Sequence, residues 1–447
     1  MDVIRSIFFI CRNAPERGFS HGGCCERQEG RVVSFIVLSV NDCRCFVLSA
    51  FLYNFVAGGE LLFPCLLNRL KFILMSRRTS PTQHVVVIDP HRVTPSYIYS
   101  HASLVHGSVE LLTDLPSWYA RRSARLRMLR CGVWVVRRLW RGAFHGLTAE
   151  QLLLSRWLRH RHTTVVLSEF GTSAADLLPV YRHAGVAVVP FFHGMDATRR
   201  DVVRRYRERY ARLFAYVRCV LCASPHLAER LRLMGCRVPV VSVPCLPSPF
   251  YYKLRATLAE PMFFFCGRFV EKKSPQAVLL AFAELVRTHP EARLVMAGDG
   301  PLLKSARQLA ALLGIDGAVS FPGWIDRSAH GQFLERATAY VQHSMTAPDG
   351  DCEGTPVSVM EAMAAGVPVI STRHAGIPFV ARHDVTALLV DEGDYMSMAR
   401  DMALLLEQPH TARRIGDEAR RHMAGQLPKS REAELINDVL RDASRGV

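Results

Sequence analysis

The stretch EGTPVSVMEAMAAGVPVIST, residues 353–372, places two glutamates eight positions apart among small and apolar residues. Thr355 suits the N-cap of a helix, the proline after it suits the first helical position, and a Gly-Val-Pro step supplies the stop. The pattern predicts a helix over 356–365, followed by a strand over 367–371, with another strand over 339–343 before the loop. This order of elements is typical of a parallel α/β sheet.

The two carboxylates occupy different positions relative to this helix. Glu353 lies in the preceding loop, where the free N–H groups of the first turn and the positive end of the helix dipole favour an anion. Glu361 lies four residues after Val357 and shares its face, more than one turn into the helix. One carboxylate therefore lies at the mouth of a predicted anion site and the other on its wall. Such a site suits a ligand with a phosphate and several hydroxyls.

The composition describes a folded, basic protein. The chain has 447 residues, enough for two ordinary domains and an appendage, and 49% of them are hydrophobic, which disfavours extensive disorder. Its formal charge of +16 is carried by arginine more than by lysine. That surplus favours a polyanionic partner such as a nucleotide, a phospholipid surface or a nucleic acid.

The thirteen cysteines are scattered, odd in number and mostly embedded in apolar runs. They indicate reduced, buried thiols in a cytoplasmic protein. The C-x2-C pair of Cys219 and Cys222, with Cys236 and Cys245 downstream, faintly resembles a zinc site. No further pair completes the spacing, and the first pair lies in a strand pattern, so zinc is disfavoured.

Two sets of alternating strands and helices follow one another along the chain. Four apolar strands are predicted in residues 75–243 and six in 261–425, with a Pro-rich linker over 244–260. Two such sets predict an α/β protein with two Rossmann-like, doubly wound domains that face a cleft. Residues 426–447 are expected to form a C-terminal helix that packs back on the N-terminal domain.

Residues 1–74 differ from the rest of the chain. They hold six of the thirteen cysteines, and their apolar stretches are shorter than the roughly twenty residues that span a bilayer. They also lack the order of a signal peptide. Because a regular pattern opens at Met75, this atypical extension is interpreted either as a disordered or mis-assigned start or as a membrane-proximal segment.

Four short motifs together make a specific resemblance: FHGMD at 192–196, GRFVEKK at 267–273, AGDGPL at 297–302 and EGTPVSVME at 353–361. In this order they resemble the retaining glycosyltransferases of the GT-B fold, family GT4, of the bacterial exopolysaccharide and colanic-acid type. The resemblance implies a nucleoside-diphosphate sugar as donor and a polysaccharide or lipid-linked saccharide as acceptor. It also implies that the N-terminal domain binds the acceptor and the C-terminal domain binds the donor.

Arg268 and Lys273 follow directly after a predicted strand, at the carboxyl end where ligands bind in such sheets. Sugar transfer requires the charge on the departing diphosphate to be neutralised, and the resemblance implies that these two residues do so. The alternative is a solvated basic turn, since Glu271 and Lys272 lie between them. Donor contacts are also expected from the start of the helix, at Gly354, Thr355 and Pro356.

The resemblance assigns a role to each of the acidic residues. Glu353 is expected to contact the donor sugar and to steady the developing oxocarbenium charge, and Glu361 is expected to meet the ribose. An exposed helix residue without a role is the alternative for Glu361. However, a lone carboxylate among apolar residues needs a partner.

His193 ends a predicted strand and is similar to the family's cleft histidine, which hydrogen-bonds the transferred sugar from the opposite lobe. The alternative is a histidine whose hydrogen bonds are satisfied within the core. Gly194 permits close backbone approach on the acceptor side. Asp196 is expected either to hold the His193 imidazole or to touch the acceptor.

Some residues depart from the family pattern. Phe379 and Tyr97 stand where acidic residues are common, which puts acceptor recognition in doubt. Asp349 and Asp351 form a D-x-D sequence, but that metal signature belongs to a different glycosyltransferase architecture. In a GT-B site the protein supplies the positive charge, so neither a metal nor a cofactor is expected.

Eleven arginines lie in residues 121–161, interleaved with tryptophans, against the single acid Glu150. This pattern indicates a basic amphipathic face, and we expect a peripheral protein on the cytoplasmic side of an anionic membrane. A solvated surface is the alternative.

A second hypothesis for the chain is a catalytically inactive polyanion-binding or nucleic-acid-binding protein. The five residues Arg268, Lys273, Glu353, Glu361 and His193 argue against it, so no nucleic-acid partner is expected.

Overall fold

The computed structural model describes residues 27–28, 31–32, 37–40, 43–46, 84–89, 96–122, 147–425 and 427–445. The chain divides into two units, residues 1–81 and 82–447, which are described separately. In the first unit, β1 (Arg27–Gln28) pairs antiparallel with β2 (Arg31–Val32), and β3 (Val37–Val40) with β4 (Cys43–Phe46). The predictions for the rest of residues 1–74, and those for 123–146, lie outside the described residues.

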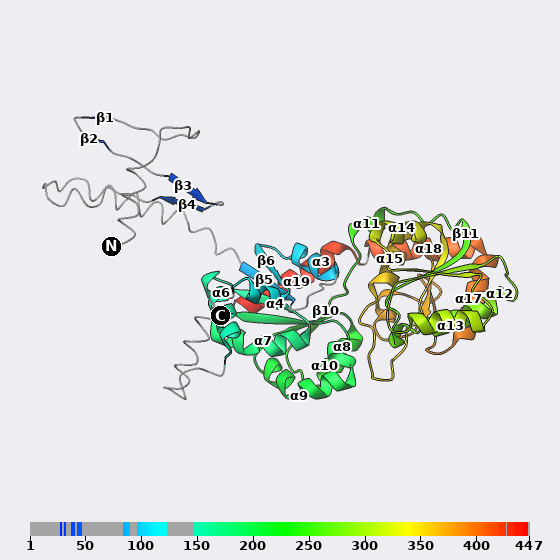
Figure 1. Cartoon of the computed structure of the whole chain (residues 1–447), viewed down its shortest axis with the longest axis horizontal. Helices are drawn as coiled ribbons and strands as arrows, with labels where there is room; N and C mark the ends of the chain where they lie inside the picture. The colour runs from blue at the N-terminus through cyan, green and yellow to red at the C-terminus, as the bar shows by residue number, and fades with distance from the viewer. Residues whose placement is uncertain are drawn as a thin grey trace. The chain divides into compact units, whose positions relative to one another are not determined.

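The first sheet of the second unit is parallel, six-stranded and ordered β10-β9-β8-β7-β5-β6 (Figure 1). Its strands are β5 (His84–Asp89), β6 (Ser108–Thr113), β7 (Val165–Glu169), β8 (Ala187–Phe192), β9 (Val220–Cys222) and β10 (Val240–Ser242). The helices of this domain are α3 (Ser96–Leu104), α4 (Leu115–Ala120), α6 (Ala149–His160), α7 (Gly171–Ala184), α8 (Met195–Thr198), α9 (Arg200–Phe214) and α10 (Pro225–Leu233). The four apolar strands predicted are the inner ones, and the two edge strands β6 and β10 were missed.

The second sheet is also parallel and has the order β13-β12-β11-β14-β15-β16. Its strands are β11 (Glu260–Cys266), β12 (Arg293–Ala297), β13 (Val319–Gly323), β14 (Ala337–Val341), β15 (Val369–Thr372) and β16 (Leu388–Val390). Its helices are α12 (Pro275–Val286), α13 (Leu303–Leu312), α14 (Arg327–Arg336), α15 (Val357–Ala365), α16 (Ile377–Val380), α17 (Tyr395–Glu407) and α18 (Pro409–Gly425). All six predicted strands are present, so two parallel α/β sheets are confirmed.

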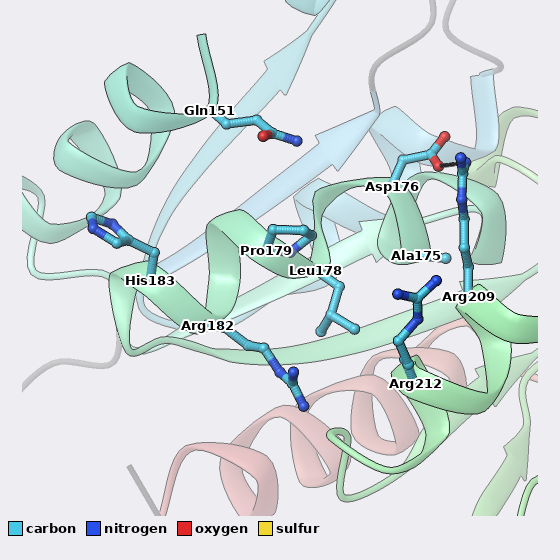
Figure 2. Close-up of a pocket in the computed structure, with 9 residues that line it drawn as sticks. All are labelled: Gln151, Ala175, Asp176, Leu178, Pro179, Arg182, His183, Arg209 and Arg212. Carbon is cyan, nitrogen blue, oxygen red and sulfur yellow. Dashed lines mark hydrogen bonds and ion pairs between the residues drawn. The ribbon is translucent and has the colours of Figure 1, made fainter. Parts of the chain in front are cut away.

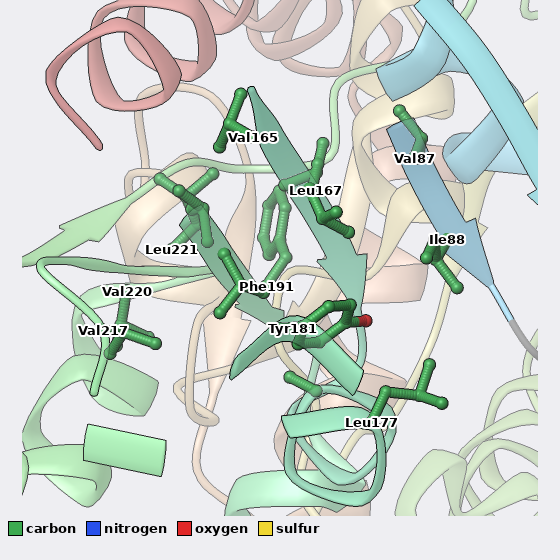
Figure 3. Close-up of a cluster of buried hydrophobic side chains, with 14 of the residues drawn as sticks. Val87, Ile88, Val165, Leu167, Leu177, Tyr181, Phe191, Val217, Val220 and Leu221 are labelled. Carbon is green, nitrogen blue, oxygen red and sulfur yellow. The ribbon is translucent and has the colours of Figure 1, made fainter. Parts of the chain in front are cut away.

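The side chains of β11 alternate between two buried cores, one on each face of this sheet. Phe263 and Phe265 are buried in one core, whereas Met262 and Phe264 are buried in the other. Because successive side chains of a strand point to opposite faces, each face of the sheet has its own apolar layer. Figure 3 shows the corresponding packing in the first domain, where side chains of β5, β7, β8 and β9 meet Leu177 and Tyr181 of α7.

The segment predicted as a linker contains a short helix, α11 (Pro249–Lys253). The last helix, α19 (Lys429–Ser444), returns to the first domain, where it contacts β7, β8 and α3 and buries Ile436 and Leu440. No helix within the described part of the chain combines the length and the apolar character needed to cross a membrane.

Candidate functional site

A cavity of about 540 Å³ is lined by residues from both domains. Tyr97 and Tyr99 come from α3 of the first domain, while Cys266 and Glu361 come from the end of β11 and from α15 of the second. Trp324, directly after β13, lines this cavity and is 79% exposed. A concave site with an exposed aromatic ring and a partly buried acid suits a ligand with a flat ring and hydroxyl groups.

Glu361 lies beside Tyr251, whose hydroxyl favours the ionised carboxylate through a hydrogen bond, and beside His330. His330 Nδ1 lies 3.8 Å from Glu361 Oε2 and 3.0 Å from the Tyr251 hydroxyl. Burial raises the pKa of Glu361 to about 7, and burial also lowers the pKa of His330 to about 4. At neutral pH the imidazole is therefore uncharged and the carboxyl group titrates. The alternative of an exposed Glu361 is wrong. His330 was not singled out from the sequence, because it stands alone in a polar helix pattern.

Lys273 and Glu353 form the centre of a second group of charges. Lys273 Nζ lies 3.0 Å from Glu353 Oε1 and donates a hydrogen bond to Gln342 Oε1 at 3.1 Å. Lys272 Nζ lies 3.1 Å from Asp351 Oδ1 and 4.0 Å from Glu353 Oε2. Burial alone would raise the pKa of Glu353, but the two ammonium groups, Lys273 foremost, lower it to about 2.

The predicted basic turn therefore divides into two parts. Lys272 is buried and Lys273 is partly buried, whereas Arg268 is exposed. The alternative of a fully solvated turn is wrong for both lysines. Arg268 remains available to an anionic ligand. The sequence analysis noted Lys272 only as a residue between Arg268 and Lys273. The structure shows that Lys272 pairs with Asp351 and so holds the 349–353 loop.

The loop that carries Glu353 is fixed from behind by a histidine. The backbone N–H of Glu353 donates to His374 Nε2 at 3.1 Å, and His374 Nδ1 lies 2.6 Å from Glu392 Oε1. Glu392 also accepts the backbone N–H of Thr346 at 2.8 Å. Because Nε2 accepts, the proton of a neutral His374 is on Nδ1 and points at Glu392. This arrangement sets the position of Glu353 relative to Lys273.

Gly354 occupies a gap too narrow for any other residue. A Cβ at Gly354 would lie 2.4 Å from the His193 carbonyl oxygen, and a Cβ at Gly376 would lie 1.6 Å from the Gly354 carbonyl oxygen. The backbone of the donor-side loop thus touches the end of β8 in the other domain. A side chain at Gly354 would force the two segments apart.

The helix start differs from the prediction by one residue. Pro356, rather than Thr355, is the N-cap of α15, and no side chain caps the first turn. Thr355 Oγ1 is buried and has no hydrogen-bond partner among the described residues. In the first turn the Val359 N–H donates to the Pro356 carbonyl oxygen at 3.1 Å, which leaves the N–H groups of Val357 and Ser358 to serve an anion beside Arg268 and Lys273.

Both ring nitrogens of His193 face the protein. Nε2 lies 2.6 Å from Glu169 Oε2, and Nδ1 lies 3.8 Å from Cys245 Sγ. The ring stacks on Phe191 with a centroid separation of 4.5 Å. Burial opposes protonation, but contacts with Cys245 and Glu169 raise the pKa of His193 to about 9. A hydrogen bond to a sugar requires Nδ1 to exchange Cys245 for a hydroxyl, so that role stays a prediction.

Asp196 does not hold the imidazole, contrary to one of its two predicted roles. Its Oδ1 accepts the backbone N–H groups of His193 at 3.1 Å and Gly194 at 3.0 Å, and its Oδ2 accepts that of Gly171 at 2.8 Å. The side chain is fully buried. Asp196 therefore fixes the turn after β8, where Gly194 has a φ of 152° and lies against Cys352. Glu169 is the residue that holds His193, and sequence reasoning missed it.

Asp349 and Asp351 are engaged by protein groups. Asp349 Oδ2 lies 3.5 Å from Arg199 Nε, and Asp349 Oδ1 accepts the backbone N–H of Asp351 at 2.9 Å.

Cys219 and Cys222 lie at β9, where burial raises the pKa of both thiols to about 11. Phe379 is partly exposed on α16, and Tyr97 packs against His193 at a centroid separation of 4.9 Å.

The geometry places a lysine-paired acid in the loop before an uncapped helix, and Val357 and the partly buried Glu361 of that helix line the cavity. The family model described as "Glycosyl transferases group 1" matches residues 253–422, which include every one of these donor-side groups. These residues form a group 1 glycosyltransferase domain. Within it, the Arg268 to Lys273 turn and the Glu353 to Glu361 segment belong to the matched region.

Relatives and solved structures extend the likeness beyond the glycosyltransferase domain. The chain is 33% identical over 215 residues to the amylovoran biosynthesis glycosyltransferase AmsK of Erwinia amylovora, covering 47% of this chain and 53% of the relative. It is 32% identical over 248 residues to the putative colanic acid biosynthesis glycosyltransferase WcaL of Escherichia coli, covering 54% and 60%. The chain thus spans little more than half the length of these curated relatives.

Solved structures show the two-domain GT-B fold. Alr3699/HepE of Anabaena, in complex with UDP and glucose, has a TM-score of 0.59 and 14% identity, covering 80% of this chain and all of that one. A glycosyltransferase of Rickettsia africae has a TM-score of 0.62 and 12% identity, covering 82% and 100%. At these identities the likeness concerns the fold alone.

Proposed function

We propose that the protein is a retaining glycosyltransferase that moves a sugar from a nucleoside-diphosphate sugar to a polysaccharide or lipid-linked saccharide. The observation that carries the proposal is the placement of Lys273 and Glu353, 3.0 Å apart, at the uncapped start of α15. Positive charge and free N–H groups converge there on one point of the cleft. Relatives named for amylovoran and colanic acid biosynthesis support a saccharide acceptor.

In this proposal the donor occupies the cavity and the adjoining charged loops. Arg268 and Lys273 bind the diphosphate, and Glu361 bonds the ribose hydroxyls. The bond between the anomeric carbon and the diphosphate oxygen breaks, and the acceptor oxygen bonds to the same face of that carbon. The acceptor proton passes to the departing phosphate. Glu353 is near the reacting carbon and stabilises the positive charge that develops there. The lowered pKa of Glu353 keeps its carboxylate ionised, and an ionised carboxylate stabilises a positive charge more strongly than a neutral acid does.

We also propose that this reaction needs neither a metal nor a cofactor. The departing diphosphate carries negative charge, which Arg268, Lys273 and the start of α15 can neutralise. Asp351 already pairs with Lys272. The protein groups therefore replace the function that a divalent cation has in other transferases.

A basic surface on the first domain supports a peripheral position at an anionic membrane. Residues 199–237, which contain α9 and α10, hold eleven arginines against three acids, and this surplus of eight charges is half of the chain's +16. Arg204 and Arg207 of α9 are exposed, and Leu233 at the end of α10 exposes 73% of its surface. Arginine around an exposed apolar residue suits an anionic headgroup layer.

Two hollows lie on this surface. One, of about 620 Å³, is lined by Arg200, Arg204, Arg207 and Arg230. The other, of about 1050 Å³, lies among α6, α7 and α9 and is shown in Figure 2, where Arg182 and Arg212 lie on one side of Leu178 and Pro179 and Arg209 is paired with Asp176. Neither hollow contains a donor-side residue. We therefore assign this surface to membrane attachment on the cytoplasmic side rather than to chemistry.

The relatives reported above are named as glycosyltransferases, which gives no support to the alternative of an inactive polyanion-binding protein. A thermal-shift panel of UDP-, GDP- and ADP-sugars tests the proposal, because a specific ligand stabilises the folded state by mass action. We expect one nucleotide class to raise the melting temperature of the wild type but not of Arg268→Ala. Arg287→Ala, at the exposed C-cap arginine of α12, is the matched control. Stabilisation by duplex DNA and by no sugar nucleotide would overturn the proposal.

A further inference from the structure

A string of five ionisable side chains runs from the candidate site to the last helix. His193 Nε2 lies 2.6 Å from Glu169 Oε2, and Glu169 Oε1 lies 2.9 Å from His101 Nδ1. His101 Nε2 lies 3.3 Å from Glu432 Oε1, and Glu432 Oε2 accepts a hydrogen bond from Lys429 Nζ. Basic and acidic groups thus alternate from the end of β8, through β7 and α3, to α19.

The string is closed off from solvent at its centre. The side chains of Glu169, His101 and Glu432 are fully buried, and that of His193 is 7% exposed. A buried charge is stable only where partners compensate for its lost hydration. Each member of the string therefore depends on the next for its charge.

The distances determine where the protons are. An ionised carboxylate can only accept hydrogen bonds, so Glu169 requires a proton on His193 Nε2 and another on His101 Nδ1. The remaining nitrogen of His101, Nε2, lies 3.3 Å from the carboxylate of Glu432, within ion-pair distance but without the geometry of a hydrogen bond, and a proton there makes His101 an imidazolium. The pKa values agree with this arrangement. Despite burial, contacts with Glu169 foremost, then with Cys245 and Glu432, raise the pKa of His101 well above its ordinary value, and His101 and His193 lower that of Glu169 to about 2.

Other ionisable groups also face His193. They come from every element packed against it and are Cys245 after β10, Tyr97 and His101 on α3, Asp196 on α8 and Glu169 on β7. Cys245 Sγ, 3.8 Å from Nδ1, is the group beside its second nitrogen. Contacts with His101 and His193 lower the pKa of this thiol although burial opposes it.

We propose that Glu432 is a positioning residue for His193, acting through His101 and Glu169, so that the last helix completes the candidate site. Glu432 keeps a proton on His101 Nε2, His101 then keeps Glu169 ionised, and Glu169 fixes the protonated Nε2 and the ring orientation of His193. Only Nδ1 of His193 is left for a ligand. Binding of a sugar to this nitrogen rests on the proposed function. The arrangement of the five side chains does not depend on it.

The first test observes the histidines directly and needs no turnover. ¹⁵N-histidine spectra of the full chain are recorded against pH, with His101→Gln and His193→Gln used to assign the two signals. In the wild type we expect both rings to stay charged above pH 7. In Glu432→Gln we expect the midpoint of His101 to fall by at least about one pH unit. Glu434→Gln, at an exposed glutamate of the same helix, is expected to leave both midpoints unchanged.

Turnover is measured on the same variants. We expect Glu432→Gln to lower kcat at pH 7 and to move the alkaline limb of the pH profile to lower pH, whereas Glu434→Gln has the wild-type profile. Ordinary titration of His101 and His193 in the wild type, or unchanged midpoints in Glu432→Gln, would overturn the proposal. If Glu432→Gln does not fold, Lys429→Met leaves the carboxylate in place, and loss of charge from His101 in that variant would equally overturn it. Charged histidines without sugar transfer would contradict only the proposed function.

Discussion

Lys273 Nζ lies 3.0 Å from Glu353 Oε1, and both side chains are more than four-fifths buried. Each comes from a loop at the carboxyl end of the second sheet, after β11 and β14 respectively. The pair is therefore part of the fold as well as of the candidate site. Arg268, on the same turn as Lys273, is exposed and has no such structural role.

Replacing these two basic residues should separate binding from stability. We expect Arg268→Ala to weaken donor binding and slow turnover at an unchanged free energy of unfolding. Lys273→Met should impair the same steps and also cost about 3 kcal/mol of stability, because it leaves a buried carboxylate less compensated. Urea denaturation and donor titration measure the two effects. The double variant Lys273→Met with Glu353→Gln should regain stability but not turnover, and unchanged kinetics in both single variants would contradict the assignment.

The stability of the protein should depend on Glu361 in a defined pH range. The folded-state pKa of about 7 lies above the ordinary value of 4.5, so the folded protein keeps a proton that the unfolded chain has lost. The contribution of this group is fully present below pH 4.5 and is lost as the pH rises to about 7. Glu361→Gln should remove this loss, on the order of 3 kcal/mol, between pH 4.5 and pH 8.

Denaturation curves of the wild type and Glu361→Gln at both pH values provide the measurement. Glu291→Gln, at an exposed carboxyl group, is the control and should follow the wild type. An equal loss of stability in all three proteins would show that Glu361 titrates normally.

Chelation should leave sugar transfer intact. Arg268, Lys273 and the start of α15 supply positive potential at the diphosphate, so we expect full activity in EDTA. The measurement is the initial rate with and without chelator, followed by addition of magnesium or manganese. Loss of activity in EDTA and its recovery with either ion would assign Asp349 and Asp351 to a metal instead.

Membrane attachment should depend on the basic surface of α9 and α10. We expect the full chain to float with phosphatidylglycerol vesicles and not with phosphatidylcholine vesicles, and to detach as salt rises because screening acts within about 10 Å at 0.1 M. Charge reversal at Arg204, Arg207 and Arg230 should abolish flotation. The matched control reverses three basic residues of the other domain, namely Arg287, Lys304 and Arg421.

Reversal of Arg137, Arg138 and Arg141, which lie outside the described residues, tests the other arginine-rich segment, residues 121–161. If only this second variant loses flotation, attachment belongs to residues 121–161 rather than to α9 and α10. A protein that stays in the soluble fraction with both kinds of vesicle would contradict membrane attachment through either segment.

The inner strands of both sheets could be predicted because parallel strands covered on both faces are continuous apolar runs. The edge strand β6 mixes polar and apolar residues and is only partly buried, and β10 has three partly buried residues. Such strands have no apolar run to detect. The helix start was placed one residue early, since Thr355 has the side chain of an N-cap but leaves it unpaired.

Site residues that belong to a short local motif could be predicted, whereas contacts between residues distant in the sequence could not. Arg268, Lys273, Glu353 and Glu361 were found because each belongs to a short local pattern. The pairs that hold the surrounding segments could not be found in this way: Lys272 meets Asp351, 79 positions away, and His101 meets Glu169, 68 positions away. Pairs of this kind become visible only when the sheets have brought distant segments together.

The packing of α19 also affects the order in which the protein can fold during synthesis. Ile436 and Leu440 belong to the same buried core as Ile88 and Leu167, yet the ribosome reaches them only after the whole second sheet has been translated. Domains commonly fold in turn as they leave the ribosome. Here the first domain emerges with part of its core uncovered, so the nascent chain must carry that apolar surface until residue 444 has been added.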